Sequence, residues 1–131
     1  KHYALECFND VVKRALDADV SPAFTLWIWL HESGASNYTG RPGIDGIQDF
    51  GVNINSIAKN FDAQITKFLQ LPSAYKAICK SATMETFISR YYNGSCTPRS
   101  AAEKAKIAPY LNELRQTWSL VSPGTRVPDY P

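Results

Sequence analysis

The sequence predicts an α+β domain that is mostly helical, with a small β-hairpin inserted after the second helix. Apolar side chains recur every three or four residues along most of the 131-residue chain, which is the spacing of a buried helix face. Five of the seven glycines lie between residues 34 and 51, a composition typical of turns and hairpins. Helical spacing resumes near residue 56, so the small sheet is expected to interrupt a set of helices.

The first two helices follow from apolar spacing and from capping residues. Residues 3–18 carry apolar side chains at helical intervals, including Phe8, Val11 and Ala15. In a second helix over residues 21–33, Ser21 can cap the start, Pro22 suits the first position and Gly34 can end the helix. Apolar side chains cover nearly the whole surface of this second helix, which is therefore expected to be buried.

The glycine-rich stretch, residues 34–55, is expected to hold short extended strands, near residues 46–51. A helix then begins at Ser56 and is expected to stop at Pro72, because proline has no amide hydrogen and does not fit a helix interior. A short helix over residues 73–80 follows.

The last two helices again show capping signals. Thr83 can cap a helix that ends at Asn93-Gly94. A capping-box pattern at residues 100–103 opens the final helical segment, which reaches Trp118. Pro109 lies inside this segment and predicts a kink or a break there.

Length and charge limit what the chain can be. Residues 1–121 are expected to form one domain, and residues 122–131, with three prolines, an extended tail. The net charge is only +2 and no basic run occurs, so a nucleic-acid partner is not expected. The sequence contains no stretch of 18 apolar residues, so no membrane span is expected. We expect a monomer.

The three cysteines, Cys7, Cys79 and Cys96, leave two alternatives open. Cys79 and Cys96 flank one predicted helix and could form a disulfide, or all three could be reduced. No metal site is expected, since neither a C-x-x-C nor an H-x-x-x-H spacing is present.

Glu32 is the leading candidate for chemistry. It lies at the end of the apolar helix, close to a core and to the negative end of the helix dipole. Both surroundings favour the protonated carboxylic acid, which is the form that a general acid needs. Asp49 follows 17 residues later and could face Glu32 across a cleft, and glycoside cleavage commonly uses such a pair. Asp45 is the competing second carboxylate, although beside Gly46 it also suits a turn.

Two sets of short motifs extend this hypothesis. Glu32-Ser33, then Asp49-Phe50-Gly51, then Ile54-Asn55-Ser56 resemble, in order and spacing, motifs of the lysozyme superfamily. Glu32-Ser33-Gly34 and the later Tyr92-Asn93-Gly94 are similar to motifs of bacterial lytic transglycosylases, which belong to the same superfamily. The roles of general acid and second carboxylate are those known for lysozyme, and they are carried over from it.

The resemblance implies a lysozyme-like fold and a glycosidase that cleaves peptidoglycan or a related amino-sugar polymer without a cofactor. Glu32 would be the general acid and Asp49 the second carboxylate. It also implies an extracellular, periplasmic or cell-wall-associated location. The residues expected to bind substrate are Ser33, Tyr38, Gln48, Gly51, Tyr92 and Asn93.

Several alternatives stay open at this point. The motif glutamine expected before Ile54-Asn55-Ser56 and the alanine expected after Asn93 are both missing, which suggests an inactive domain that only binds a glycan or a partner protein. An enzyme acting on chitin or chitosan is a third possibility. Hydrolysis and transglycosylation are both compatible with the motifs, and Asp49 favours hydrolysis, because lytic transglycosylases typically need no second carboxylate.

Overall fold

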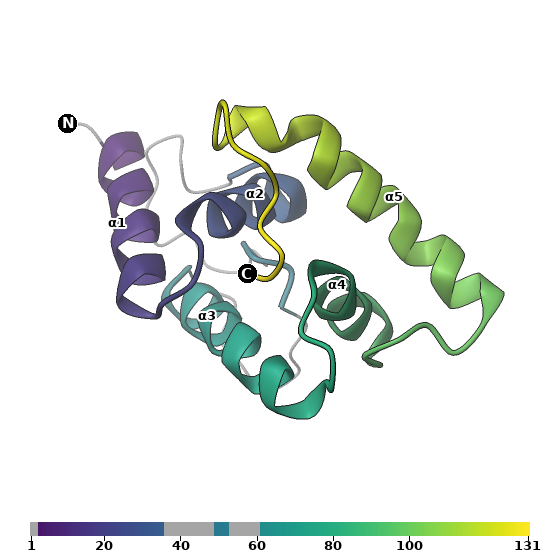
Figure 1. The fold of residues 1–131 in the computed structure, drawn as a ribbon. Coiled ribbons are helices and arrows are strands. Elements are labelled where there is room, and N and C mark those ends of the chain that lie inside the picture. The colour runs from purple at the N-terminus through teal and green to yellow at the C-terminus, as the bar shows by residue number, and fades with distance from the viewer. Residues whose placement is uncertain (1–2, 36–48, 53–60) are drawn as a thin grey trace. The chain divides into compact units, whose positions relative to one another are not determined.

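A computed structural model describes residues 3–35, 49–52 and 61–131 of the chain (Figure 1). The chain divides into two compact units, Lys1–Gln70 and Leu71–Pro131, which we call the N-terminal and the C-terminal unit. The boundary between them falls inside helix α3, Phe61–Ile78.

The N-terminal unit is built from α1 (Tyr3–Asp17), α2 (Pro22–Ser33) and the first half of α3. Helix α1 packs against α2, and Arg14 of α1 pairs with Asp10 on its own helix and with Asp62 on α3. The predicted second helix is confirmed. Ser21 Oγ accepts the amide hydrogen of Phe24 at 3.2 Å, and Gly34 ends the helix in the left-handed conformation.

The expected α+β class is wrong. The described ranges contain helices, turns and irregular segments but no strand, so the architecture there is all-α. Of the stretch expected to form the hairpin, residues 36–48 and 53–55 lie outside the described ranges. Residues 49–52, which are described, form a turn whose backbone groups bond to a side chain of α3 instead of to a neighbouring strand. A high glycine content is equally suited to such a side-chain-held turn.

The prediction that Pro72 ends a helix is also wrong. Helix α3 runs without interruption through Pro72 to Ile78, and no separate helix starts at residue 73. Leu69 and Leu71, in the turn just before the proline, are buried, and so is Pro72 itself. Packing therefore holds the helix together despite the missing amide hydrogen. Helix α5 (Ala101–Thr117) likewise continues through Pro109 without the break that the sequence suggested.

The C-terminal unit holds the second half of α3, α4 (Met84–Asn93), α5 and a short 3-10 helix, Trp118–Leu120. Helix α4 packs against α5, and its predicted ends are confirmed. Thr83 forms a capping box with Thr86, and Gly94 adopts the left-handed conformation at the other end. Ser100 caps α5, but the Glu103 carboxylate bonds to Arg99 instead of closing a capping box. Hydrogen bonds from Arg99 hold the pKa of Glu103 at about 2.

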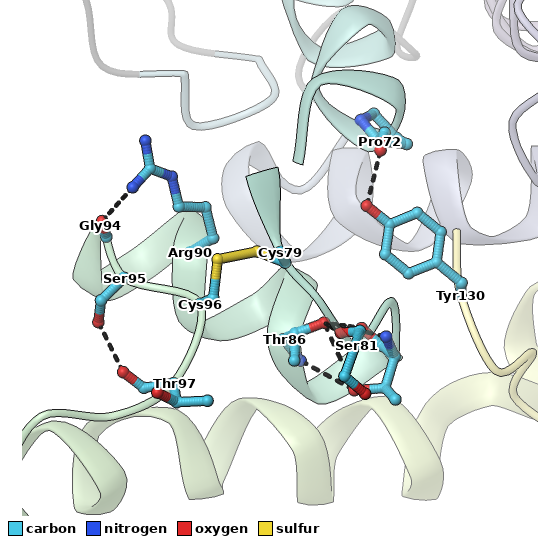
Figure 2. Close-up of a disulfide and its surroundings, with 11 residues drawn as sticks. Pro72, Cys79, Ser81, Thr86, Arg90, Gly94, Ser95, Cys96, Thr97 and Tyr130 are labelled. Carbon is cyan, nitrogen blue, oxygen red and sulfur yellow. Dashed lines mark hydrogen bonds between the residues drawn. A yellow bond between two sulfur atoms is a disulfide. The ribbon is translucent and has the colours of Figure 1, made fainter. Parts of the chain in front are cut away.

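A disulfide between Cys79 and Cys96 joins the end of α3 to the loop that follows α4, as Figure 2 shows. The Cα atoms of the two cysteines are 5.6 Å apart, a normal separation for a disulfide. The same loop is tied back by Arg90, whose guanidinium donates to the carbonyl of Gly94 at 2.5 Å. Cys7 is buried on α1 and is not disulfide-bonded. The sequence had left open whether Cys79 and Cys96 pair or all three cysteines are reduced, and the structure shows the pair.

The tail, residues 122–131, returns to helix α3 within the C-terminal unit. The Tyr130 hydroxyl donates to the carbonyl of Pro72 at 2.6 Å (Figure 2), and the Tyr130 ring meets Phe87 edge-on at 6.0 Å. Burial raises the pKa of Tyr130 and that of the neighbouring Tyr75. Trp118 Nε1 donates to Thr125 Oγ1 at 2.9 Å and fixes the start of the tail.

Candidate active site around Glu32

Glu32 occupies the last turn of α2, in the N-terminal unit. Residues 24–29 of that helix are all buried, and the side chains that it places in the core include Phe24, Ile28 and Trp29. Glu32 itself is half-buried. The helix therefore carries a carboxyl group out of an apolar core to the edge of that core.

The turn at residues 49–52 lies against the same core. The ring of Phe50 is fully buried and lies 6.3 Å from the ring of Trp29, with an interplanar angle of 15°. It also lies 5.9 Å from Phe61 and 5.6 Å from Phe68. Such close ring contacts add to the hydrophobic stabilisation of the turn. Phe50 thus anchors the turn between α2 and α3.

The backbone of the turn is held by Gln64 of α3, whose side chain is fully buried. Gln64 Oε1 accepts from the amide of Phe50 at 3.4 Å and from that of Val52 at 3.2 Å. Gln64 Nε2 donates to the carbonyl of Val52 at 3.1 Å. One amide side chain thereby satisfies three buried backbone groups.

Gly51 brings the turn into contact with Glu32. Gly51 has φ of +66°, and a Cβ atom added to it would lie 2.5 Å from Glu32 Oε2, 2.6 Å from Cδ and 2.8 Å from Cγ. The space that a side chain would fill at residue 51 is therefore taken by the Glu32 carboxyl group. The resemblance implied that Gly51 binds substrate, whereas the close approach seen in the structure is to Glu32.

Asp49, the predicted second carboxylate, is fully buried at the start of this turn. Its neighbour Phe50 is equally buried, so the first half of the turn faces the core. A carboxylate with no solvent-exposed surface cannot contact a substrate in this conformation. In this structure Asp49 is therefore a buried carboxyl group, and Glu32 is the partly exposed carboxyl group beside the turn.

The remaining predicted residues of the N-terminal unit are placed only in part. The hydroxyl of Ser33 donates to the carbonyl of Trp29 at 3.0 Å, one helical turn back. His31, beside Glu32, stacks on Trp27 with ring centroids 4.8 Å apart. Tyr38, Gln48 and the competing carboxylate Asp45 lie outside the described residues.

Tyr92 and Asn93 belong to α4 in the C-terminal unit. The ring of Tyr92 stacks on Tyr110 of α5, with centroids 3.8 Å apart and an interplanar angle of 16°. Asn93 Nδ2 donates to the carbonyl of Glu103 at 3.1 Å, and Lys106 donates to the carbonyl of Tyr92 at 3.0 Å. These contacts fasten α4 to α5. A role for either residue beside Glu32 stays a prediction.

Gln64 was not among the residues predicted from the sequence. A signal for it existed, because Gln64 stands three residues after Phe61 and four before Phe68, on the apolar face of the expected helix. A polar residue on such a face needs hydrogen-bond partners, and the backbone of a glycine-rich turn nearby in the sequence can provide them. The partners themselves depend on the tertiary fold.

Among the residues that the structure describes, no three histidine, cysteine or acidic side chains gather as metal ligands would. None of the described helices combines the length and the apolar character needed to cross a bilayer. In the comparisons with known proteins, no family model matches this chain, and neither a curated protein nor a solved structure matches it.

Proposed function

We propose that this protein is a peptidoglycan-cleaving glycosidase that uses Glu32 as its acid. The observation that carries the proposal is the placement of the Glu32 carboxyl group: it lies half-buried at the end of a buried helix and against the backbone of a fixed turn. A carboxyl group held between a core and a rigid backbone keeps a defined orientation, which proton transfer to a substrate oxygen requires. The motif resemblance supplies the class of substrate, a polymer of alternating amino sugars.

In the proposed reaction, the proton of Glu32 moves to the bridging oxygen, and the bond between that oxygen and the anomeric carbon breaks. Positive charge develops on the sugar ring during this step. A hydroxyl group of the same sugar then attacks the anomeric carbon, and its proton returns to the Glu32 carboxylate. The glycan is cut into two ends, no water is consumed, and one end carries an internal anhydro ring.

The burial of Asp49 favours this one-carboxylate route over hydrolysis. A retaining or inverting hydrolase needs a second carboxylate that reaches the sugar or a water molecule beside it. The proposal therefore reverses the preference for hydrolysis that the spacing of Glu32 and Asp49 suggested, and it assigns Asp49 to the support of the turn.

The disulfide bears on where such an enzyme would work. Disulfides form and persist in oxidising compartments and are rare in the cytosol. The bond between Cys79 and Cys96 is therefore compatible with a site of action outside the cytoplasm, at the cell wall. We propose an extracellular, periplasmic or cell-wall-associated location on that basis.

The direct test compares wild type with Glu32→Gln on soluble peptidoglycan strands. Glutamine keeps the shape of the side chain but cannot donate a carboxylic proton, so we expect cleavage to fall by about 100-fold or more. The matched control is Glu85→Gln, which makes the same chemical change on an exposed residue of α4. Equal rates for Glu32→Gln and wild type would remove Glu32 from the mechanism. Binding of strands by wild type without any cleavage would favour the inactive, glycan-binding alternative.

A further inference from the structure

Gln64 makes an unusual set of contacts for a core residue. Its side chain is fully buried, and the oxygen and the nitrogen of its amide group both form hydrogen bonds with the backbone of one turn, residues 49–52. Burying an amide without partners is unfavourable, so these three hydrogen bonds fix the relation between α3 and the turn.

Phe50 and Gln64 restrain the turn in different ways. The ring of Phe50 sets how deeply the turn is inserted, but hydrophobic contact has little directional preference. Hydrogen bonds weaken steeply with misalignment, so the amide of Gln64 sets the orientation of the backbone at residues 50 and 52. Gly51, which lies between these two residues, is thereby fixed as well.

The orientation of Gly51 matters because it limits the space of Glu32. The Glu32 carboxyl group fills the position where a Cβ atom of residue 51 would lie. A small rotation of the turn would close that space or open it, and the carboxyl group would settle in another rotamer. A continuous series of contacts therefore leads from Gln64 through the turn to Glu32.

We infer that Gln64 is a positioning residue for Glu32: it acts through the turn at residues 49–52 and has no contact with substrate itself. Its effect on catalysis rests on the proposed function, whereas its effect on the geometry of Glu32 does not. The amide group suits this role because it can accept from two backbone amides and donate to a carbonyl at the same time. An aliphatic side chain of the same length can do neither.

The main test variant is Gln64→Met, which keeps the length of the side chain and removes all three hydrogen bonds. We expect kcat on soluble peptidoglycan strands to fall by about 10- to 100-fold while KM changes less than about twofold, since orientation and not binding is lost. Gln64→Met is also expected to lose the nuclear Overhauser contact between the Glu32 Cγ protons and the Gly51 Cα protons. If Gln64→Met does not fold, Gln64→Asn takes its place as the test variant. Its side chain is shorter by one methylene, and it is expected to show the same two changes.

The controls are Ile65→Val and Ile65→Ala, on the next, equally buried residue of α3. They span a range of lost stability, so one can be matched to Gln64→Met in melting temperature. A matched Ile65 variant should keep both kcat and the Overhauser contact. An equal fall of kcat in that control would overturn the inference, as would an unchanged contact and kcat in Gln64→Met. Because the Overhauser contact does not depend on turnover, this test can succeed or fail apart from the Glu32→Gln test of the proposed function.

Discussion

The contact between Gly51 and Glu32 predicts an effect of Gly51→Ala that separates activity from stability. The added methyl group would lie 2.5–2.8 Å from three atoms of the Glu32 side chain, closer than non-bonded atoms approach. The turn is held by Gln64 and Phe50, whereas the end of the Glu32 side chain can rotate. We therefore expect Glu32 to turn away and the backbone to stay.

The magnitudes follow from two separate terms. An alanine at φ of +66° is strained by roughly 1–2 kcal/mol, a loss of stability that any left-handed glycine position would show. Displacing the acid by about 1 Å lowers the rate of cleavage by about 100-fold. Gly51→Ala should thus lose roughly 1–2 kcal/mol of stability, as an alanine at any left-handed glycine position would, and most of its activity.

Gly124→Ala is the matched control, because Gly124 has φ of +75° and nothing within 4 Å of an added Cβ atom. It carries the same kind of backbone strain without touching Glu32. The assay pairs denaturant unfolding with the rate of peptidoglycan cleavage for both variants. The reasoning is refuted if Gly51→Ala cleaves as fast as Gly124→Ala at the same stability.

Two further predictions concern the C-terminal unit. Replacing Cys79 and Cys96 together by serine should lower the free energy of unfolding by about 3 kcal/mol, because the bridge closes a loop of 17 residues; thermal melts with and without a reductant check this, and a reductant that shifts the double variant as much as wild type would contradict it. Tyr130→Phe removes the hydrogen bond to the carbonyl of Pro72 and should lower stability by about 1 kcal/mol at neutral pH. Burial raises the pKa of Tyr130 above its usual value of 10, so its contribution is complete below about pH 10 and is lost as pH rises through the higher folded pKa. In unfolding experiments across that range, wild type should therefore lose more stability than Tyr130→Phe, and parallel curves would count against the hydrogen bond.

Local signals in the sequence predicted most of the helix ends. Ser21, Thr83 and Ser100 each cap a helix where expected, and Gly34 and Gly94 end helices in the left-handed conformation. Caps are readable because a short polar side chain or a missing Cβ acts on backbone groups within a few residues. Such interactions need no knowledge of the rest of the fold.

Predictions failed where packing outweighed a local preference. Pro72 lies within α3 just after the buried Leu69 and Leu71, and the turn at residues 49–52 forms no strand because Gln64 takes its hydrogen bonds. Both outcomes depend on neighbours that are distant in the sequence or on the burial of a whole helix. Composition alone could not distinguish a hairpin from a turn held by a side chain.

The roles of the candidate site residues stay predictions, and the structure adds what surrounds them. Glu32 was predicted from the apolar helix that precedes it, and the structure places it half-buried in the last turn of that helix. The spacing of Asp49 suggested a catalytic partner, but spacing does not tell which way a side chain points, and Asp49 is buried. Gln64 was missed because its partners appear only once α3 lies beside the turn.

The most direct test of the whole account is the mass of the fragments released from purified peptidoglycan by wild type and by Glu32→Gln. The account predicts that wild type releases fragments lighter by one water than the products of hydrolysis, and that Glu32→Gln releases almost none. Release of the same fragments at the same rate by both proteins, or no release by wild type, would contradict it.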